Sequence, residues 1–194
     1  IAYTLDQAQL GDMYTQDAYE WFKKLAFKNM LSRFENAKET EKQIPECLLV
    51  TDMTEAETVF ANCACAHTVA YYVAQDTGIA LAFSEDNSYF IATQGFLTMD
   101  YLVGKLDGLR KNSKLVSFDC KKTYGCFDGN IDMVSGFFDV KLAAYLMNPL
   151  KSEYTLDDVA TEYCDIVLPD YKSQFGKAGY TEAFETDETK FTAY

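Results

Sequence analysis

The chain has 194 residues, of which 48% are hydrophobic and 15% aromatic, and its 30 acidic and 17 basic side chains give a net charge of −13. This length and composition predict one globular domain with an appendage and exclude a disordered chain. Because so acidic a surface repels phosphate, we expect the chain by itself to bind DNA weakly or not at all.

The sequence carries no sign of membrane insertion or export. No apolar run approaches the length of a membrane span, and the N-terminus lacks the pattern of a signal peptide. We therefore expect a cytoplasmic protein without a membrane partner, in which the six cysteines are reduced thiols. Cys63 and Cys65 have only His67 close to them, so we expect no zinc site. The first residue is Ile, which predicts a piece of a longer chain.

The N-terminal part of the sequence differs in pattern from the rest. Residues 17–34 place apolar side chains at helical spacing, which predicts a helix or a helix pair. The charged run at 35–46 contains Ile44-Pro45 and has the composition of a linker. We therefore expect two domains, at 1–45 and 46–194.

Strand and helix patterns alternate after this linker. Cys47–Val50 is expected to be an edge strand, and the run Thr54-Glu-Ala-Glu57 has the form of a capping box that begins a helix. An antiparallel meander of three strands is predicted at Thr68–Ala74, Ile79–Phe83 and Ser88–Ala92. A helix is predicted at 98–109, followed by one more strand at 114–118. This order indicates an α/β fold with a mixed sheet.

Helix signals dominate the sequence after residue 118. A short helix is predicted at Asp119–Phe127, and Asp139 is a good N-cap for a second helix that ends at Asn148-Pro149. Thr155-x-x-Asp158 predicts a third, capped helix. From Tyr171 onward the sequence is polar with scattered aromatics, and no element is predicted there.

Several runs resemble family A DNA polymerases, the family of bacterial DNA polymerase I. The 3′–5′ exonuclease domain is matched at Phe138-Asp139, Leu142-Ala143-Ala144-Tyr145-Leu146 and Tyr154–Ala160. The end of the 5′-nuclease region is matched at Phe22, Leu25, Phe27, Met30, Leu31 and Arg33. The resemblance implies a ribonuclease-H-like fold, a mixed sheet flanked by helices, in a C-terminally truncated domain at 46–194.

The same resemblance implies a parent chain with a wider role. That parent would be a DNA-directed DNA polymerase, a nucleotidyltransferase of DNA replication and repair that uses magnesium. The partners of the fragment would be the polymerase and 5′-nuclease regions of the parent, which would bind the DNA.

Active members of this family hold two metal ions, and this sequence lacks the ligands for them. Two-metal hydrolysis needs converging carboxylates around ions that activate water and stabilise the leaving oxygen. By the resemblance, the first pair of acids falls on Tyr72 and Ala74, and the next falls on Thr123, or on Lys122 if the alignment shifts by one. The last falls at or beyond Tyr194. We therefore expect an inactive, structural domain with no catalytic residue, no metal and no cofactor.

Two other functions stay open. An active exonuclease with relocated ligands would use Asp76, Asp119 and Asp139. A stand-alone acidic binding module would need no catalytic group. His67 lacks a well-placed nucleophile beside it and is expected at a strand edge. The most basic local cluster is expected to be a solvated loop and consists of Arg110, Lys111 and Lys114.

Two short motifs have simple interpretations. Asp76-Thr77-Gly78 matches the aspartic-protease triplet, but a single copy between two strands predicts a hairpin turn. Four residues match calcium-loop positions, although Met133 stands where that loop needs Gly, so a plain turn is expected: Asp128, Asn130, Asp132 and Asp139.

Overall fold

The computed structural model describes residues 11, 13–25, 27–31, 34, 46–85, 88–127, 136–164, 166–169 and 171–194. They belong to two compact units, residues 1–43 and 44–194, which are described separately. The expected linker lies outside the described residues except for Glu46.

The smaller unit contains a helix pair, as expected from the spacing of its apolar residues. Helices α1 (Gln16–Lys24) and α2 (Lys28–Leu31) follow one another, and Thr15 caps α1 by accepting a hydrogen bond from the amide of Ala18. Phe34 is 1% exposed and contacts the rings of three residues, Tyr14, Tyr19 and Phe22. An aromatic cluster therefore holds this pair together.

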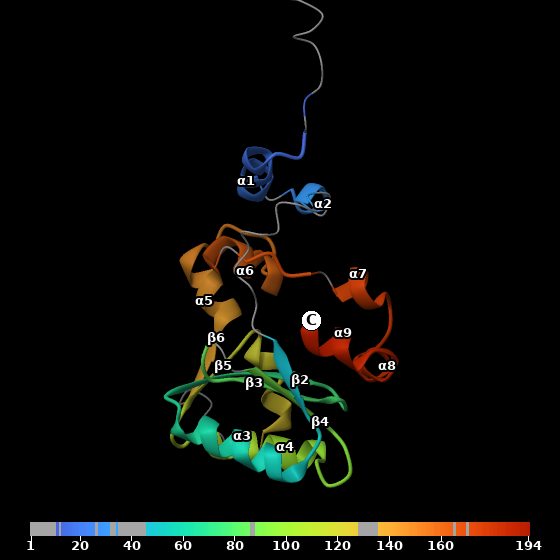
Figure 1. The fold of residues 1–194 in the computed structure, drawn as a ribbon. Helices are drawn as coiled ribbons and strands as arrows, with labels where there is room; N and C mark the ends of the chain where they lie inside the picture. Colours follow the sequence, from blue (N-terminus) through green and yellow to red (C-terminus); the bar gives the residue numbers. More distant parts are fainter. Residues whose placement is uncertain are drawn as a thin grey trace, which may run out of the picture. The chain divides into compact units, whose positions relative to one another are not determined.

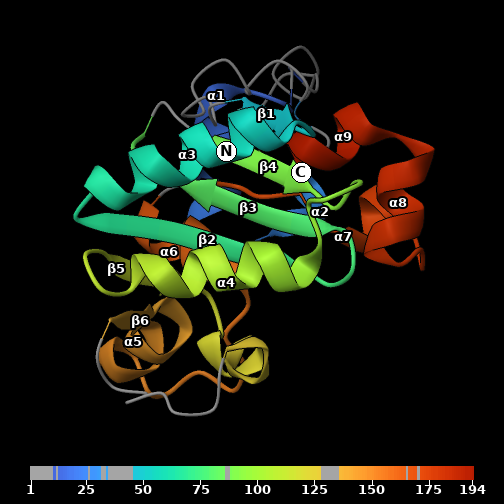
Figure 2. The same ribbon diagram turned by 90° about the horizontal axis from the view of Figure 1, so that it is seen from below.

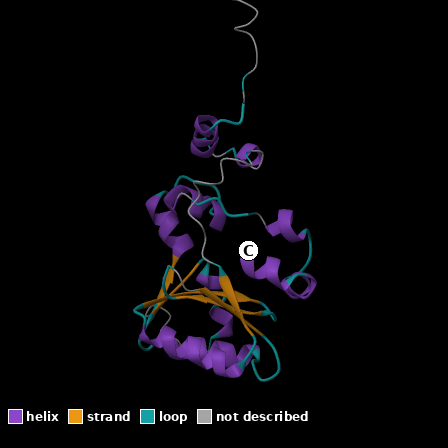
Figure 3. Cartoon of the chain, in the orientation of Figure 1, coloured by secondary structure: helices purple, strands orange, loops and turns teal. Residues whose placement is uncertain are grey.

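The larger unit is built on a six-stranded mixed sheet (Figures 1 and 3). Its strands, in the order β1-β4-β3-β2-β5-β6, are β1 Cys47–Val50, β4 Ser88–Ala92, β3 Gly78–Ala82, β2 Thr68–Ala74, β5 Lys114–Ser117 and β6 Phe137–Asp139. The meander β2-β3-β4 is antiparallel, whereas β1, β5 and β6 each pair in parallel with their neighbour. The predicted meander and the edge position of β1 are confirmed.

Alternation along β2 assigns its side chains to two faces of the sheet. Val69, Tyr71 and Val73 are buried in the main core. That core is covered by α3 (Met53–Cys65) and α4 (Met99–Leu109), which lie together across one face of the sheet (Figure 2). Because successive residues of a strand point to opposite faces, Tyr72 and Ala74 face the other side.

The second face of the sheet is covered by helices that the sequence pattern did not predict. The segment after Tyr171 forms α7 (Tyr171–Phe175), α8 (Tyr180–Thr186) and α9 (Glu188–Ala193). Phe191 and Ala183 from these helices are buried with Phe90 and Ala74 from the sheet in a second core. The interpretation of this segment as polar chain without an element was therefore wrong.

Local signals set most of the remaining boundaries. Asp52, not the Thr54 capping box, caps α3, and its carboxylate accepts hydrogen bonds from the amides of Thr54 and Glu55. The predicted helix at Asp119–Phe127 is instead two 3₁₀ turns, η3 (Cys120–Lys122) and η4 (Tyr124–Cys126). Helices α5 (Val140–Met147) and α6 (Leu156–Cys164) occupy the predicted places.

Candidate functional site

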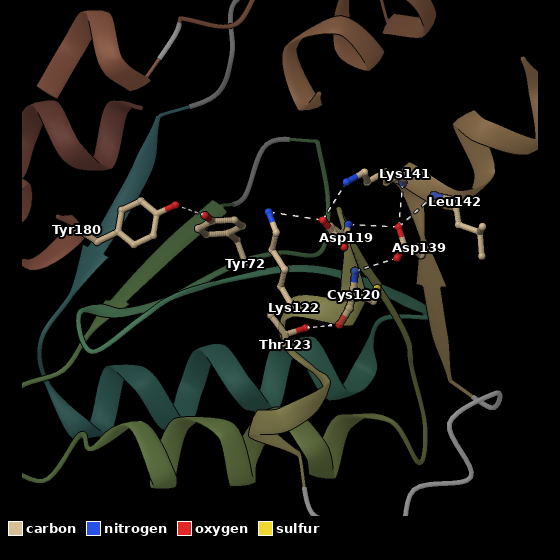
Figure 4. A network of polar contacts seen from close by, with 9 residues as sticks. All are labelled: Tyr72, Asp119, Cys120, Lys122, Thr123, Asp139, Lys141, Leu142 and Tyr180. Carbon is tan, nitrogen blue, oxygen red and sulfur yellow. Dashed lines mark hydrogen bonds and ion pairs between the residues drawn. The ribbon is translucent and has the colours of Figure 1, made fainter. Parts of the chain in front are cut away.

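The first implied metal-ligand position, Tyr72, lies on the central strand β2 and contacts helix α8. Its hydroxyl is 2.5 Å from the hydroxyl of Tyr180, and the two rings meet edge to face with centroids 6.1 Å apart (Figure 4). Burial and the neighbouring Tyr180 raise the pKa of Tyr72 above its ordinary value. A neutral phenol that is bonded to another phenol offers no anionic oxygen to a divalent ion.

The second implied position, Ala74, is buried. Ala74 is 1% exposed and belongs to the second core with Phe90, Ala183 and Phe191. The methyl group of Ala74 cannot bind a metal ion. A carboxylate at this position would be buried among apolar groups without water to solvate it.

The position implied for the next acid, Thr123, is at the end of η3. Its hydroxyl donates a hydrogen bond to the carbonyl of Cys120 at 3.0 Å (Figure 4). The same hydroxyl lies 3.0 Å from the hydroxyl of Tyr71. Burial raises the pKa of Tyr71, so the phenol stays protonated and can donate to Thr123. Lys122, the shifted alternative, is a cation and is paired with Asp119 at 3.5 Å.

Asp119 is the nearest carboxylate in sequence to Thr123, and it is held by cations. Lys141 on α5 lies 3.0 Å from its Oδ2, and Lys122 lies 3.5 Å from the same atom (Figure 4). Mainly through the hydrogen bond from Lys141, the pKa of Asp119 is lowered from its ordinary value. This carboxylate is therefore ionised but already neutralised by two ammonium groups.

The carboxylate of Asp139 accepts hydrogen bonds from backbone amides. As predicted, it caps α5, with Oδ1 accepting from the amides of Lys141 and Leu142 at 2.9 and 3.2 Å. The same carboxylate also accepts hydrogen bonds from the amides of Asp119, at 3.2 Å, and Cys120, at 2.9 Å, in the turn after β5. Four amide donors give this carboxylate a structural role that joins two segments of the chain.

The pair of divalent ions implied by the family resemblance does not fit these residues. Hard divalent cations require several oxygen ligands, usually carboxylates. In the part of the chain that the structure describes, no three His, Cys, Asp or Glu side chains gather as a metal site requires. The relocated set Asp76, Asp119 and Asp139 is fully described and does not form such a group.

The remaining motif residues have ordinary positions. Asp76, with a φ of 59°, and Thr77 lie between β2 and β3, which confirms the predicted hairpin turn. His67 is exposed directly before β2, with Nδ1 3.3 Å from the hydroxyl of Thr68. Of the four calcium-like residues, Asp128, Asn130 and Asp132 lie outside the described residues, and Asp139 caps α5.

The basic cluster of the α4–β5 connection is divided between separate contacts. Arg110 bonds Asp107 at 2.7 Å and lies over the ring of Phe137. The ammonium of Lys114 lies 4.8 Å from the ring centre of Phe138. These two cations are held against aromatic rings at the β6 side of the sheet.

Tyr180 and Lys141 are the site residues that sequence reasoning missed. Tyr171 and Phe175, and likewise Tyr180 and Phe184, are four residues apart, which is the spacing of one helix face. This signal could have indicated the C-terminal helices. The pairing of Tyr180 with Tyr72 spans 108 residues, so no local pattern carries it.

Comparison with known proteins agrees with the fold. The family model described as DNA polymerase I, ribonuclease H-like domain, matches residues 65–188, more than half of the chain. No curated protein matches the sequence significantly.

Solved structures share the architecture at low identity. The EXO domain of Nibbler from Aedes aegypti is similar with a TM-score of 0.58 and 12% identity, over 76% of this chain and 81% of that chain. A mutant form of the catalytic core of RRP6 from Trypanosoma brucei is similar with a TM-score of 0.50 and 11% identity, over 73% of this chain and 42% of that chain. This chain thus spans less than half of the RRP6 core, and such low identities show the fold alone.

No helix among the described residues is long and apolar enough to cross a bilayer.

One assignment follows from the six-stranded mixed sheet, its flanking helices and the family model that matches most of this unit. The chain belongs to the DNA polymerase I, ribonuclease H-like domain family and carries a 3′–5′ exonuclease-like domain.

Proposed function

We propose that this domain is a degenerate, catalytically inactive member of the family that serves as a structural part of a bacterial DNA polymerase I. One observation carries the proposal: tyrosine, alanine and threonine occupy the implied ligand positions on β2 and after β5, and each is engaged in packing or hydrogen bonds. Without carboxylates there, the chain has no means to hold the ions that hydrolysis of a phosphodiester requires.

The rival activity, hydrolysis by relocated carboxylates, has less support. Asp119 is neutralised by Lys141 and Lys122, and Asp139 accepts four backbone amides. Recruiting either carboxylate to a metal would leave ammonium groups or amides unpaired, which is costly in a partly buried site.

The proposed parent is a cytoplasmic DNA polymerase of replication and repair that uses magnesium in its own polymerase site. Its polymerase module must be basic, because binding a duplex requires Lys and Arg that neutralise phosphates. The present chain, with a net charge of −13, is electrostatically complementary to such a module. In this arrangement DNA is bound through the parent and not by the fragment.

Helix α5 offers an apolar side that fits this partner role. Leu142, Tyr145 and Leu146 are spaced at i, i+3 and i+4 and are 57%, 48% and 71% exposed. Apolar residues grouped in this way are typical of protein contacts. We therefore expect this side of α5 to pack against the polymerase module.

The contact is tested in the parent polymerase with Leu146→Lys, which places a charge at the most exposed of these three residues. Limited proteolysis between the modules should become faster. Phe96→Lys is the matched control, because Phe96 is 87% exposed and lies in the loop before α4. Equal proteolysis of Leu146→Lys and the unaltered parent would argue against the contact.

The proposed inactivity is tested with the isolated chain, single-stranded DNA, and either magnesium or manganese. We expect no shortening of the DNA and no heat of manganese binding in calorimetry. Metal-dependent degradation would overturn the proposal. If manganese binding were found and disappeared in Asp119→Ala, the rival exonuclease with relocated ligands would be supported instead.

A further inference from the structure

Helix α5 is more apolar than a helix at a protein surface normally is. Among its eight residues Lys141 is the only charged one, and Ala144 is the only buried one. A helix that is apolar on nearly every side is usually enclosed, either by its own protein or by a partner. The described residues of this chain therefore leave an apolar surface on α5 uncovered.

The apolar surface continues beyond the end of α5. Leu150 follows Leu146 by four residues, lies in the connection to α6, and is 93% exposed. Helix α6 contacts α5 and adds two exposed apolar residues (Figure 1). We call this set the α5–α6 surface, and it consists of Leu142, Tyr145, Leu146, Met147, Leu150, Leu156 and Tyr163.

Internal contacts hold the α5–α6 connection in place. The hydroxyl of Tyr154 donates a hydrogen bond to the carbonyl of Asn148, and its ring meets that of Tyr145 edge to face at 5.8 Å between centroids. Lys151 forms an ion pair with Glu162 on α6. Because these contacts already order the connection, a partner can bind there without a large loss of conformational entropy.

The charges around this surface indicate the charge of its partner. Between residues 136 and 170 the sequence has seven acidic and two basic side chains. Both basic ones are paired with carboxylates, Lys141 with Asp119 and Lys151 with Glu162. A basic partner is complementary to this region, whereas a second copy of the chain, with its net charge of −13, would be repelled.

The geometry of α5 indicates the kind of element that fits. A helix offers no free backbone edge with which a strand could pair. Side chains at i, i+3 and i+4 form ridges, and the ridges of a second helix fit between them. We propose that the polymerase module contributes an amphipathic helix, with Lys or Arg beside its apolar stripe, that packs along the α5–α6 surface. This inference rests on the proposed function and adds the structure and charge of the contacting element.

Photo-crosslinking in the parent polymerase tests this contact. Leu150→p-benzoylphenylalanine places a photoreactive ketone at the most exposed residue of the α5–α6 surface. Phe96→p-benzoylphenylalanine is the matched control, because Phe96 is 87% exposed in the loop before α4. After irradiation, the crosslinked peptides are identified by mass spectrometry. The yield at position 150 should exceed that at position 96 by about 10-fold or more, because a held partner has a high effective concentration.

The identity of the crosslinked peptide decides the outcome. A peptide from one helix of the polymerase module, with Lys or Arg within one turn of the crosslinked residue, would support the proposal. Crosslinks to the 5′-nuclease region, to a second copy, or to a strand or loop would overturn it, as would a yield no higher than at position 96. None of these results involves nuclease activity, so the proposed inactivity would stand. A parent chain without a polymerase module would instead refute the proposed function.

The charge of the partner helix is tested separately with Glu153→Lys in the variant that carries the photoreactive residue at position 150. Glu153 is exposed and follows Leu150 closely, so a lysine there should repel a basic helix. The crosslink yield at low salt should fall by about 3-fold or more. Glu85→Lys is the control, because Glu85 is exposed in the β3–β4 connection and should leave the yield unchanged. Equal yields for the two lysine variants would contradict a basic partner.

Discussion

Single side chains decide the character of the implied ligand positions on β2. Ala74 has no functional group, but its environment shows how this position is packed. It is 1% exposed and is buried with side chains of α8 and α9. Tyr72 combines an apolar ring with a hydroxyl that has a specific partner in Tyr180. Ala74 therefore belongs to a packed core, whereas Tyr72 is 43% exposed and is held through its hydroxyl and ring contacts with Tyr180.

Ala74→Glu should strongly destabilise the domain. The new carboxylate would be buried among apolar groups without a partner, which costs about 3 kcal/mol or more. Ala70→Glu, the same substitution at an exposed position of the same strand, should change the free energy of unfolding by less than about 1 kcal/mol. Urea unfolding of both variants measures the difference, and equal losses of stability would contradict the burial of position 74.

High pH should destabilise the domain through Tyr71, which is buried, and Tyr72, which is bonded to Tyr180. Burial raises the pKa of Tyr71 and Tyr72 above the ordinary value of about 10, so the folded chain retains phenolic protons that the unfolded chain releases. This contribution to stability is complete below about pH 10 and is lost as the pH rises toward the folded-state pKa values. Thermal unfolding followed from neutral to alkaline pH checks the prediction.

Tyr72→Phe serves as the control for this pH dependence. This substitution removes one hydroxyl with a raised pKa and its hydrogen bond with Tyr180, while it keeps the ring. We expect it to cost about 1 kcal/mol at neutral pH and to weaken the loss of stability at alkaline pH. An unchanged alkaline profile would show that Tyr72 ionises freely in the folded chain.

At the scale of elements, capping and close approach fix the connections around the site. Asp139 begins α5 and also binds the turn after β5, so one carboxylate sets the position of both. Gly78 begins β3 where a Cβ would lie 2.3 Å from the carbonyl oxygen of Ile91 on the neighbouring strand β4. A side chain at this position would therefore force β3 and β4 apart.

Asp139→Ala should destabilise the domain more than removal of an ordinary cap. Loss of the carboxylate leaves four amides without their acceptor, and we expect a cost of about 2 kcal/mol or more. Thr98→Ala is the matched control, because Thr98 caps α4 through the single amide of Tyr101 and should cost about 1 kcal/mol. Chemical denaturation compares the two, and a smaller effect at Asp139 would contradict its double role.

For the whole molecule, charge and fold lead to opposite expectations about DNA. The exonuclease-like fold belongs to a family named for a DNA polymerase, whereas a net charge of −13 opposes contact with phosphates.

The isolated chain should therefore show no binding of a fluorescently labelled single-stranded oligonucleotide in anisotropy titrations. Lowering the salt concentration should not produce binding, because the repulsion between chain and phosphate grows as screening weakens. Tight binding that weakens with added salt would show a local basic surface that outweighs the net charge.

The sequence by itself determined the α/β class, the meander, the central helices and the absence of carboxylates at the implied ligand positions. These features depend on local periodicity, capping residues and the identity of single side chains, all of which are present in the order of residues. The Asp139 cap and the Asp76-Thr77-Gly78 hairpin are of this kind.

Only the tertiary structure decided what surrounds the implied ligand positions. The Tyr72–Tyr180 pair, the burial of Ala74 under α8 and α9, and the pairing of Asp119 with Lys141 join residues that are distant in sequence. The short C-terminal helices escaped prediction because their stability comes from packing aromatic side chains on the sheet and not from strong local signals. A surface that forms only when distant segments meet has no signature within either segment.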